Sequence, residues 1–136
     1  MKIFIACSKY HYDKIKEIKK ELEKAGHEIT LPNSFDDPLK ELRLLEEDKT
    51  AHSEWVAKAW DESEKKIKEN DAVFVVNLEK NGNQNYVGGA TFTELFMAYR
   101  MNKKLFLYNT IPEGILKDEI TGMNPTILNG DLGMIK

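Results

Sequence analysis

NYVGGATFTELFMAY, residues 85–99, is the stretch of this chain that decides its fold. An apolar run, Ala72 to Asn77, and a polar loop, Leu78 to Gln84, come before it, and a second apolar run, Leu105 to Tyr108, follows. This order predicts a strand, a glycine-rich turn, a helix and another strand. Backbone N–H groups at the start of such a helix point outward and attract anions. One carboxylate, that of Glu94, is expected just inside the helix.

Short apolar runs elsewhere in the chain predict the remaining strands. The first run, Lys2 to Cys7, is rich in β-branched and aromatic residues and does not alternate with polar ones, as in a strand buried on both faces. The full set of expected strands, the last of them short, is Lys2–Cys7, His27–Leu31, Ala72–Asn77, Leu105–Tyr108 and Pro125–Leu128.

Segments between these runs carry apolar residues at helical spacing. The first helix contains Ile15 and Leu22 and ends at Gly26, and the helix after the glycine-rich turn should run from about Ala90 to Asn102. Thr110-Ile111-Pro112-Glu113 has the spacing of a capping box and predicts the start of a last helix that ends at Gly122. The other expected helices are a short one after Pro38 and a long one over His52–Asn70.

Strands that alternate with helices predict a parallel sheet covered on both faces. We therefore expect residues 1–136 to form a single three-layer α/β domain of flavodoxin-like, Rossmann-like connectivity with about five strands. Ligands of such sheets bind beyond the carboxyl ends of the strands, where the strand order reverses. Ser8 and Asn77 should therefore face the same crevice as Gly88 to Glu94.

Composition excludes several classes of protein. A net charge of -3 gives no electrostatic reason to expect nucleic-acid binding. No apolar run approaches the roughly 20 residues that span a bilayer, so we expect a cytoplasmic protein without a membrane partner. Cys7 is the single cysteine, which excludes an intrachain disulfide. The three histidines, His11, His27 and His52, lack metal-ligand spacing, so neither a metal nor a cofactor is expected.

Familiar α/β motifs are also missing. No dinucleotide fingerprint follows the first strand, and the chain contains neither a P-loop nor a G-x-S-x-G nucleophile turn. The third strand ends in Asn77, where a phosphoacceptor domain would need an aspartate.

At Val75-Val76-Asn77, at residues 85–94 and at Ala98, the chain resembles the nucleoside 2-deoxyribosyltransferase-like superfamily, which includes nucleoside and nucleotide N-glycosidases. The segment from Ile111 to Leu132 is similar to a poorly characterised branch of it. The resemblance implies a flavodoxin-like fold, a small nucleoside or nucleotide as ligand, and a homodimer or homotetramer with sites near subunit interfaces. It also implies that Glu94 is the catalytic glutamate that attacks C1′ of the sugar.

This chemistry makes sense for a carboxylate, because breaking an N-glycosidic bond builds positive charge at C1′ that a carboxylate can stabilise or trap. The candidate substrate-binding residues are those expected around the crevice: Ser8, Tyr10, Asn77, Tyr86, Gly88, Gly89 and Thr91. The chain departs from the family pattern at Gly88, where many transferases carry a base-binding aspartate, and at Phe96, where they carry glycine. Phe4 aligns nearest to the position where the family carries a tyrosine. Ser63 aligns nearest to the position of a second family carboxylate, and Asp61 lies two residues away from it.

Two alternatives stay open on sequence alone. Thr91-x-x-Glu94 also fits a capping box, in which case Glu94 would only cap the helix. A non-catalytic sensor could bind a nucleotide-derived ligand in the same crevice. Trp55 and Trp60 are interpreted as core residues or as a subunit contact.

Overall fold

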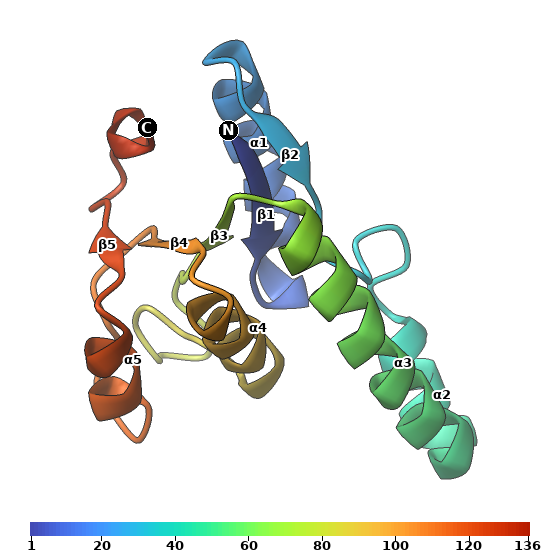
Figure 1. Cartoon of the computed structure of the whole chain (residues 1–136). Helices are drawn as coiled ribbons and strands as arrows, with labels where there is room; N and C mark the ends of the chain where they lie inside the picture. Colours follow the sequence, from blue (N-terminus) through green and yellow to red (C-terminus); the bar gives the residue numbers. More distant parts are fainter.

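The computed structural model describes residues 1–136 and contains one sheet of five parallel strands in the order β2-β1-β3-β4-β5 (Figure 1). The chain adds β2 on one side of β1 and then crosses to the other side for β3, β4 and β5. The strand order therefore reverses between β1 and β3, and the predicted flavodoxin-like connectivity is confirmed. The strands are β1 Lys2–Ala6, β2 Glu28–Thr30, β3 Ala72–Val75, β4 Lys104–Leu107 and β5 Thr126–Ile127.

Helices cover both faces of this sheet. They are α1 Tyr12–Lys24, α2 Lys40–Glu47, α3 Lys49–Glu69, α4 Gly89–Arg100 and α5 Lys117–Met123. Helix α1 packs with Ile3 and Ile5 of β1 on one face, whereas α3, α4 and α5 pack with Phe4 and Ala6 on the other. Successive residues of β1 thus enter two separate cores, which is why the apolar run showed no alternation.

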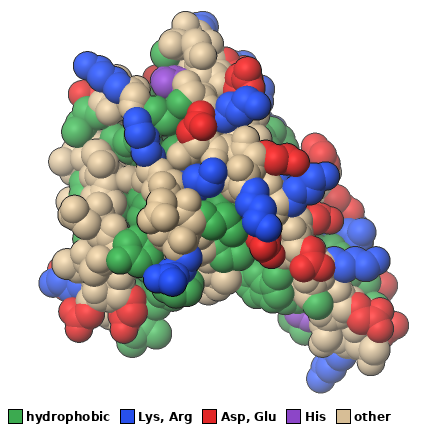
Figure 2. Space-filling model, in the orientation of Figure 1, with side chains coloured by type: hydrophobic (Ala, Val, Ile, Leu, Met, Phe, Trp, Pro, Cys, Tyr) green, Lys and Arg blue, Asp and Glu red, His purple; other side chains and the backbone are tan.

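Helices α2 and α3 form an antiparallel pair that projects from the body of the domain (Figure 1). Asp48 caps α3 by accepting hydrogen bonds from the backbone N–H groups of Thr50 and Ala51. Only the last turns of α3 reach the sheet, where Ser63 and Ile67 are buried. The projecting part carries side chains of both charges (Figure 2).

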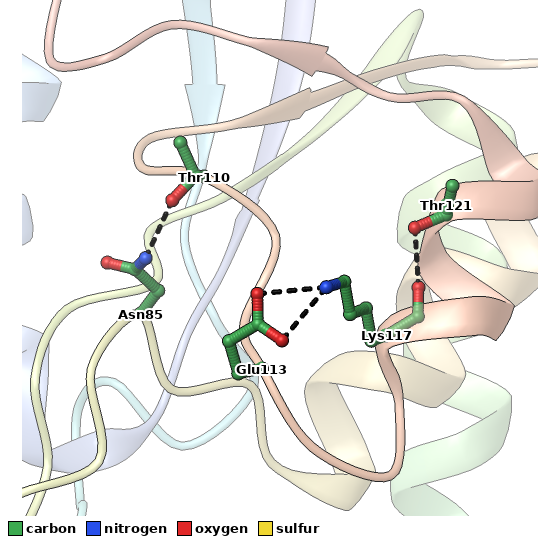
Figure 3. A network of polar contacts seen from close by, with 5 residues as sticks. All are labelled: Asn85, Thr110, Glu113, Lys117 and Thr121. Carbon is green, nitrogen blue, oxygen red and sulfur yellow. Dashed lines mark hydrogen bonds and ion pairs between the residues drawn. The ribbon is translucent and has the colours of Figure 1, made fainter.

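The predicted start of the last helix is wrong, because the residues of the expected capping box are engaged elsewhere (Figure 3). The Thr110 hydroxyl accepts a hydrogen bond from Asn85 Nδ2 at 2.9 Å. The Glu113 carboxylate pairs with Lys117 Nζ at 2.9 Å, and α5 begins only at Lys117. The helix also ends one residue beyond Gly122, at Met123, and is followed by Asn124, which takes the left-handed conformation with φ 50°.

None of the helices combines the length and the apolar composition that crossing a membrane requires.

Candidate active site

A cleft opens beyond the carboxyl ends of β1 and β3, where the strand order reverses. It consists of an inner chamber of about 490 Å³ and an outer chamber of about 270 Å³. The inner chamber lies among the end of β1, the loop after β2, helix α3 and the start of α4. The two chambers share seven lining residues: Cys7, Tyr12, Ser34, Glu41, Gly89, Ala90 and Thr91.

Glu94 lines the inner chamber from the second turn of α4, with 9% of its surface exposed. Its Oε2 atom accepts a hydrogen bond of 2.8 Å from the Ser63 hydroxyl on α3. Its Oε1 atom has no protein partner and is not among the fully buried unpaired polar atoms of the chain. One oxygen of the carboxyl group is therefore held, and the other is open to the chamber.

Burial raises the pKa of Glu94 to about 7, while the hydrogen bond from Ser63 and the charge of Lys66 oppose that rise. Lys66 lies one turn after Ser63 on α3, and its ammonium group donates to the Leu31 carbonyl at 3.0 Å. The Glu94 carboxyl group consequently changes its charge near neutral pH, which is typical of residues with a chemical role.

The capping-box interpretation of Glu94 is wrong. Helix α4 begins at Gly89 with Gly88 as its N-cap, so Thr91 lies inside the helix and cannot be the N-cap that such a box needs. No side chain caps this helix, and the Glu94 carboxyl group turns to Ser63 instead of to the backbone.

Asn33 holds Ser63 from the loop after β2. Its Nδ2 atom donates to the Ser63 hydroxyl at 2.9 Å and to the Ala59 carbonyl at 3.1 Å. Asn33 was not among the predicted site residues, because in the sequence Pro32-Asn33 indicates only the end of the strand expected at His27–Leu31. The available signal was its place at the carboxyl end of β2, on the edge of the sheet where ligands bind.

Two further polar groups of the inner chamber are neutral at physiological pH. Burial raises the pKa of the Cys7 thiol to about 12, and the charge of Glu94 adds to that rise. Burial likewise raises the pKa of Tyr12 to about 12, and its hydroxyl lies 2.8 Å from Ser34 Oγ. Cys7 is thus no thiolate nucleophile, and Tyr12 offers a phenol rather than a phenolate.

The outer chamber gathers six of the predicted binding residues, namely Ser8, Tyr10, Tyr86, Gly88, Gly89 and Thr91. Lys80, which the sequence analysis did not single out, places its ammonium group 4.4 Å from the centre of the Tyr10 ring and 4.6 Å from that of Tyr86. Such cation–π contacts hold a positive charge at the mouth of the cleft. A Cβ atom on Gly88 would lie 3.2 Å from the Tyr86 hydroxyl, so glycine lets the tyrosine pack closely there.

The first residues of α4 also line this cleft. Gly89, Ala90 and Thr91 line both chambers, and no side chain caps the helix above them. The first N–H groups of a helix have no partner within the helix and carry partial positive charge. This end of the cleft is therefore suited to an anionic or hydroxyl group of a ligand.

The expectation that Asn77 faces the crevice is wrong. Its side chain is fully buried, and its Nδ2 atom donates to the carbonyls of Asn109 and Thr110 at 3.2 and 3.0 Å. Its Oδ1 atom accepts from the Asn109 N–H group at 2.8 Å. These hydrogen bonds join the end of β3 to the loop after β4. They use both polar atoms of the Asn77 side chain, so neither is available to a ligand.

The remaining candidates divide between the cleft and the interior. Trp55 and Trp60 line the inner chamber and do not join either core, and Trp60 is 38% exposed.

His11 is buried and contacts the Glu79 carbonyl through Nε2 at 3.0 Å, and it lines neither chamber. No three His, Cys, Asp or Glu side chains come together in a group that could hold a metal ion.

No protein-family model and no curated protein matches this sequence, but solved structures do. The 2-deoxyribosyltransferase of the psychrotolerant bacterium Bacillus psychrosaccharolyticus matches with a TM-score of 0.59 and 22% identity, over 90% of this chain and 82% of that one. The CMP N-glycosidase BcmB of Clostridium botulinum matches with a TM-score of 0.53 and 18% identity, over 93% of this chain and 85% of that one.

The chain thus has the flavodoxin-like fold of nucleoside 2-deoxyribosyltransferases and shares it with enzymes that cleave or transfer N-glycosidic bonds. At these identities the likeness establishes the fold, and the activity has to be argued from the residues of the cleft.

Proposed function

We propose that the protein cleaves or transfers the N-glycosidic bond of a nucleoside or nucleoside monophosphate, with Glu94 as the nucleophile. One observation carries this proposal: a carboxyl group with a pKa of about 7 lies at the wall of a 490 Å³ chamber, with one oxygen held by Ser63 and the other free.

In the proposed reaction, Glu94 Oε1 approaches C1′ as the bond between C1′ and the base nitrogen breaks. The electron pair of that bond leaves with the base, which takes up a proton from a general acid. Oε1 forms a bond with C1′, and water or a second base later displaces the carboxylate. Glu94 must be ionised to attack, and its pKa makes the carboxylate available from neutral pH upward.

The outer chamber would hold the end of the sugar that does not react. A 5′-phosphate or a sugar hydroxyl would lie against the backbone of Gly88 to Thr91, with the Ser8 and Thr91 hydroxyls as further contacts. Lys80 adds a positive charge beside this position. Gly88 offers no side chain to recognise a base, so recognition would fall to the aromatic wall formed by Trp55 and Trp60.

The test is incubation with a panel of nucleosides and nucleoside monophosphates, followed by chromatography for free base. The panel is run with and without an added acceptor base, which separates hydrolysis from transfer. Release of base from at least one substrate by the parent protein, and not by Glu94→Gln, supports the proposal. Tight binding of a nucleotide without any base release would instead support the non-catalytic sensor.

We also propose that the protein assembles as a homodimer or homotetramer. Trp60 on α3 and Phe96 and Tyr99 on α4 are exposed aromatic side chains on helices that pack against each other. Exposed aromatic side chains on neighbouring helices are typical of a contact with another protein.

A further inference from the structure

We propose that Asn33 is a positioning residue that directs the Ser63 hydroxyl toward Glu94 and so leaves a single, defined oxygen of that carboxyl group free to react. The inference rests on the proposed function for its chemical meaning, but the contact on which it depends exists in the free protein. Three hydrogen bonds carry it: Asn33 to Ala59, Asn33 to Ser63 and Ser63 to Glu94.

The direction of these bonds is fixed by the backbone. A carbonyl oxygen can only accept, so the Asn33 atom that contacts the Ala59 carbonyl at 3.1 Å must be the amide nitrogen. That nitrogen has two hydrogens, and the second one points to Ser63 Oγ at 2.9 Å. Because Ser63 Oγ accepts from Asn33, its own proton is available for Glu94 Oε2 at 2.8 Å.

Asn33 also removes the partner that the Ser63 hydroxyl would otherwise choose. A serine in the middle of a helix commonly donates to the carbonyl four residues earlier, which for Ser63 is that of Ala59. In this structure Asn33 occupies that carbonyl. The amide therefore does two things at once, since it blocks the local acceptor and supplies the donor that turns the hydroxyl toward α4.

The consequence for Glu94 is a difference between its two oxygens. Oε2 receives a directed hydrogen bond, while Oε1 has no partner and faces the inner chamber. A carboxylate held at one oxygen cannot rotate freely, so the attacking atom keeps its position relative to a bound sugar. The orphan Oδ1 of Asn33, buried without a partner, indicates that the two donated bonds set the orientation of this side chain.

Other charged or titratable groups face Glu94 from the surrounding elements and would be left in place by a change at Asn33. The groups that interact electrostatically with Glu94 are the Cys7 thiol just after β1, the Tyr12 phenol of α1 and the Lys66 ammonium of α3. Glu41 of α2 lines the same chamber, and β3 offers no ionisable side chain. A shift of the Glu94 titration midpoint on changing Asn33 would therefore report the hydrogen bonds that run from Asn33 through Ser63 to Glu94.

The experiment follows the Glu94 side-chain carboxyl carbon by NMR in ¹³C-glutamate-labelled protein across a pH titration, without substrate. Asn33→Ala should raise the titration midpoint by about one to two pH units, as for loss of a hydrogen bond to a carboxylate. Ser63→Ala should raise it similarly. In the Ser63→Ala background, Asn33→Ala should add nothing, because its effect acts through Ser63.

The control is Asn85→Gly, which removes an amide hydrogen bond to Thr110 that involves neither Ser63 nor Glu94 and which suits the left-handed backbone of this position, with φ 56°; it should leave the midpoint unchanged. If Asn33→Ala does not fold, Asn33→Asp is compared with and without Ser63→Ala. The added charge shifts the Glu94 midpoint whether or not Ser63 is present. Only the additional shift seen when Ser63 is present therefore reports the hydrogen bonds from Asn33 through Ser63 to Glu94. A midpoint that stays put in folded Asn33→Ala, while Ser63→Ala moves it, overturns the proposal. This result does not depend on whether any base is released, so it is separate from failure of the proposed activity.

Discussion

Ser63 Oγ and Glu94 Oε2 lie 2.8 Å apart and join α3 to α4 across 31 residues of sequence. Ser63 stands nearest to the position where the resembled family carries a carboxylate. A second carboxylate there would repel the charge of Glu94 and raise its pKa further, whereas a hydroxyl donates to it. The chain therefore keeps its single buried carboxylate usable near neutral pH.

The first prediction concerns the pH dependence of base release. The rate should rise with pH through a midpoint near 7, because only the ionised form of Glu94 can attack C1′, and it should fall again only where the general acid that protonates the base loses its proton. Initial rates at substrate concentrations well below KM, measured between pH 5 and 9, report the ionisation of the free protein and check this. A rate that falls as the pH rises through 7 would mean that the protonated form is the active one, and that Glu94 acts as an acid.

The second prediction concerns stability. The pKa of Glu94 is about 7 in the folded protein and 4.5 in the reference state, so its contribution is fully present below pH 4.5 and is lost as the pH rises through 7. The loss amounts to about 3 kcal/mol of unfolding free energy. Glu94→Gln lacks this carboxyl group, so its unfolding free energy should not show this loss. Between pH 4 and pH 8, the unfolding free energy of the variant should therefore rise relative to that of the parent by about the same amount. Urea titrations at both pH values measure it, and equal pH dependence of parent and variant would contradict it.

The third prediction tests the start of α4 as the anion-binding end of the cleft. Gly89→Val should fold, because a Cβ atom there meets nothing within 4 Å apart from its chain neighbours and the backbone of its own helix, and the added side chain would crowd a ligand at this helix end. Nucleoside monophosphate binding, measured by calorimetry, should be lost. Gly122→Val is the matched control, since that glycine also lies in a helix with open space around it. Unchanged affinity in Gly89→Val places the ligand elsewhere.

The fourth prediction concerns assembly. Light scattering at micromolar concentration should give the mass of a dimer or tetramer of the 15.7 kDa chain. Replacing the exposed aromatic residues Phe96 and Tyr99 by serine should shift the distribution toward the monomer, because their apolar surface would no longer favour association. A monomer mass for the parent protein rejects the proposal.

Most of the fold could be predicted from the sequence because its signals are local. Runs such as Lys2 to Cys7 are apolar on both faces, and Gly26, with φ 95°, ends α1 as its position after Leu22 and Ala25 indicates. Local signals failed where a distant partner competed for the same groups. Thr110 has the pattern of a helix cap, but Asn85 binds its hydroxyl, and no reading of residues 110–113 alone reveals that partner.

The candidate site was predicted only in part for the same reason. The glycine-rich turn and Glu94 are contiguous in sequence, so their proximity could be foreseen. Ser63 reaches Glu94 only because α3 packs against α4, and Asn33 reaches Ser63 only because the loop after β2 folds against α3. The prediction for Asn77 failed because the sequence indicates that it lies at a strand end but does not indicate the direction of its side chain. That side chain points to the loop after β4.

The most direct test of the central claim is base release by Glu94→Gln. Glutamine keeps the size of the side chain and an oxygen that can accept from Ser63, but an amide oxygen is a far poorer nucleophile than a carboxylate. On whichever substrate the parent protein cleaves, the variant should fold, retain ligand binding and lose base release by at least about 1,000-fold. Release of base by Glu94→Gln at the rate of the parent protein would show that Glu94 is not the nucleophile.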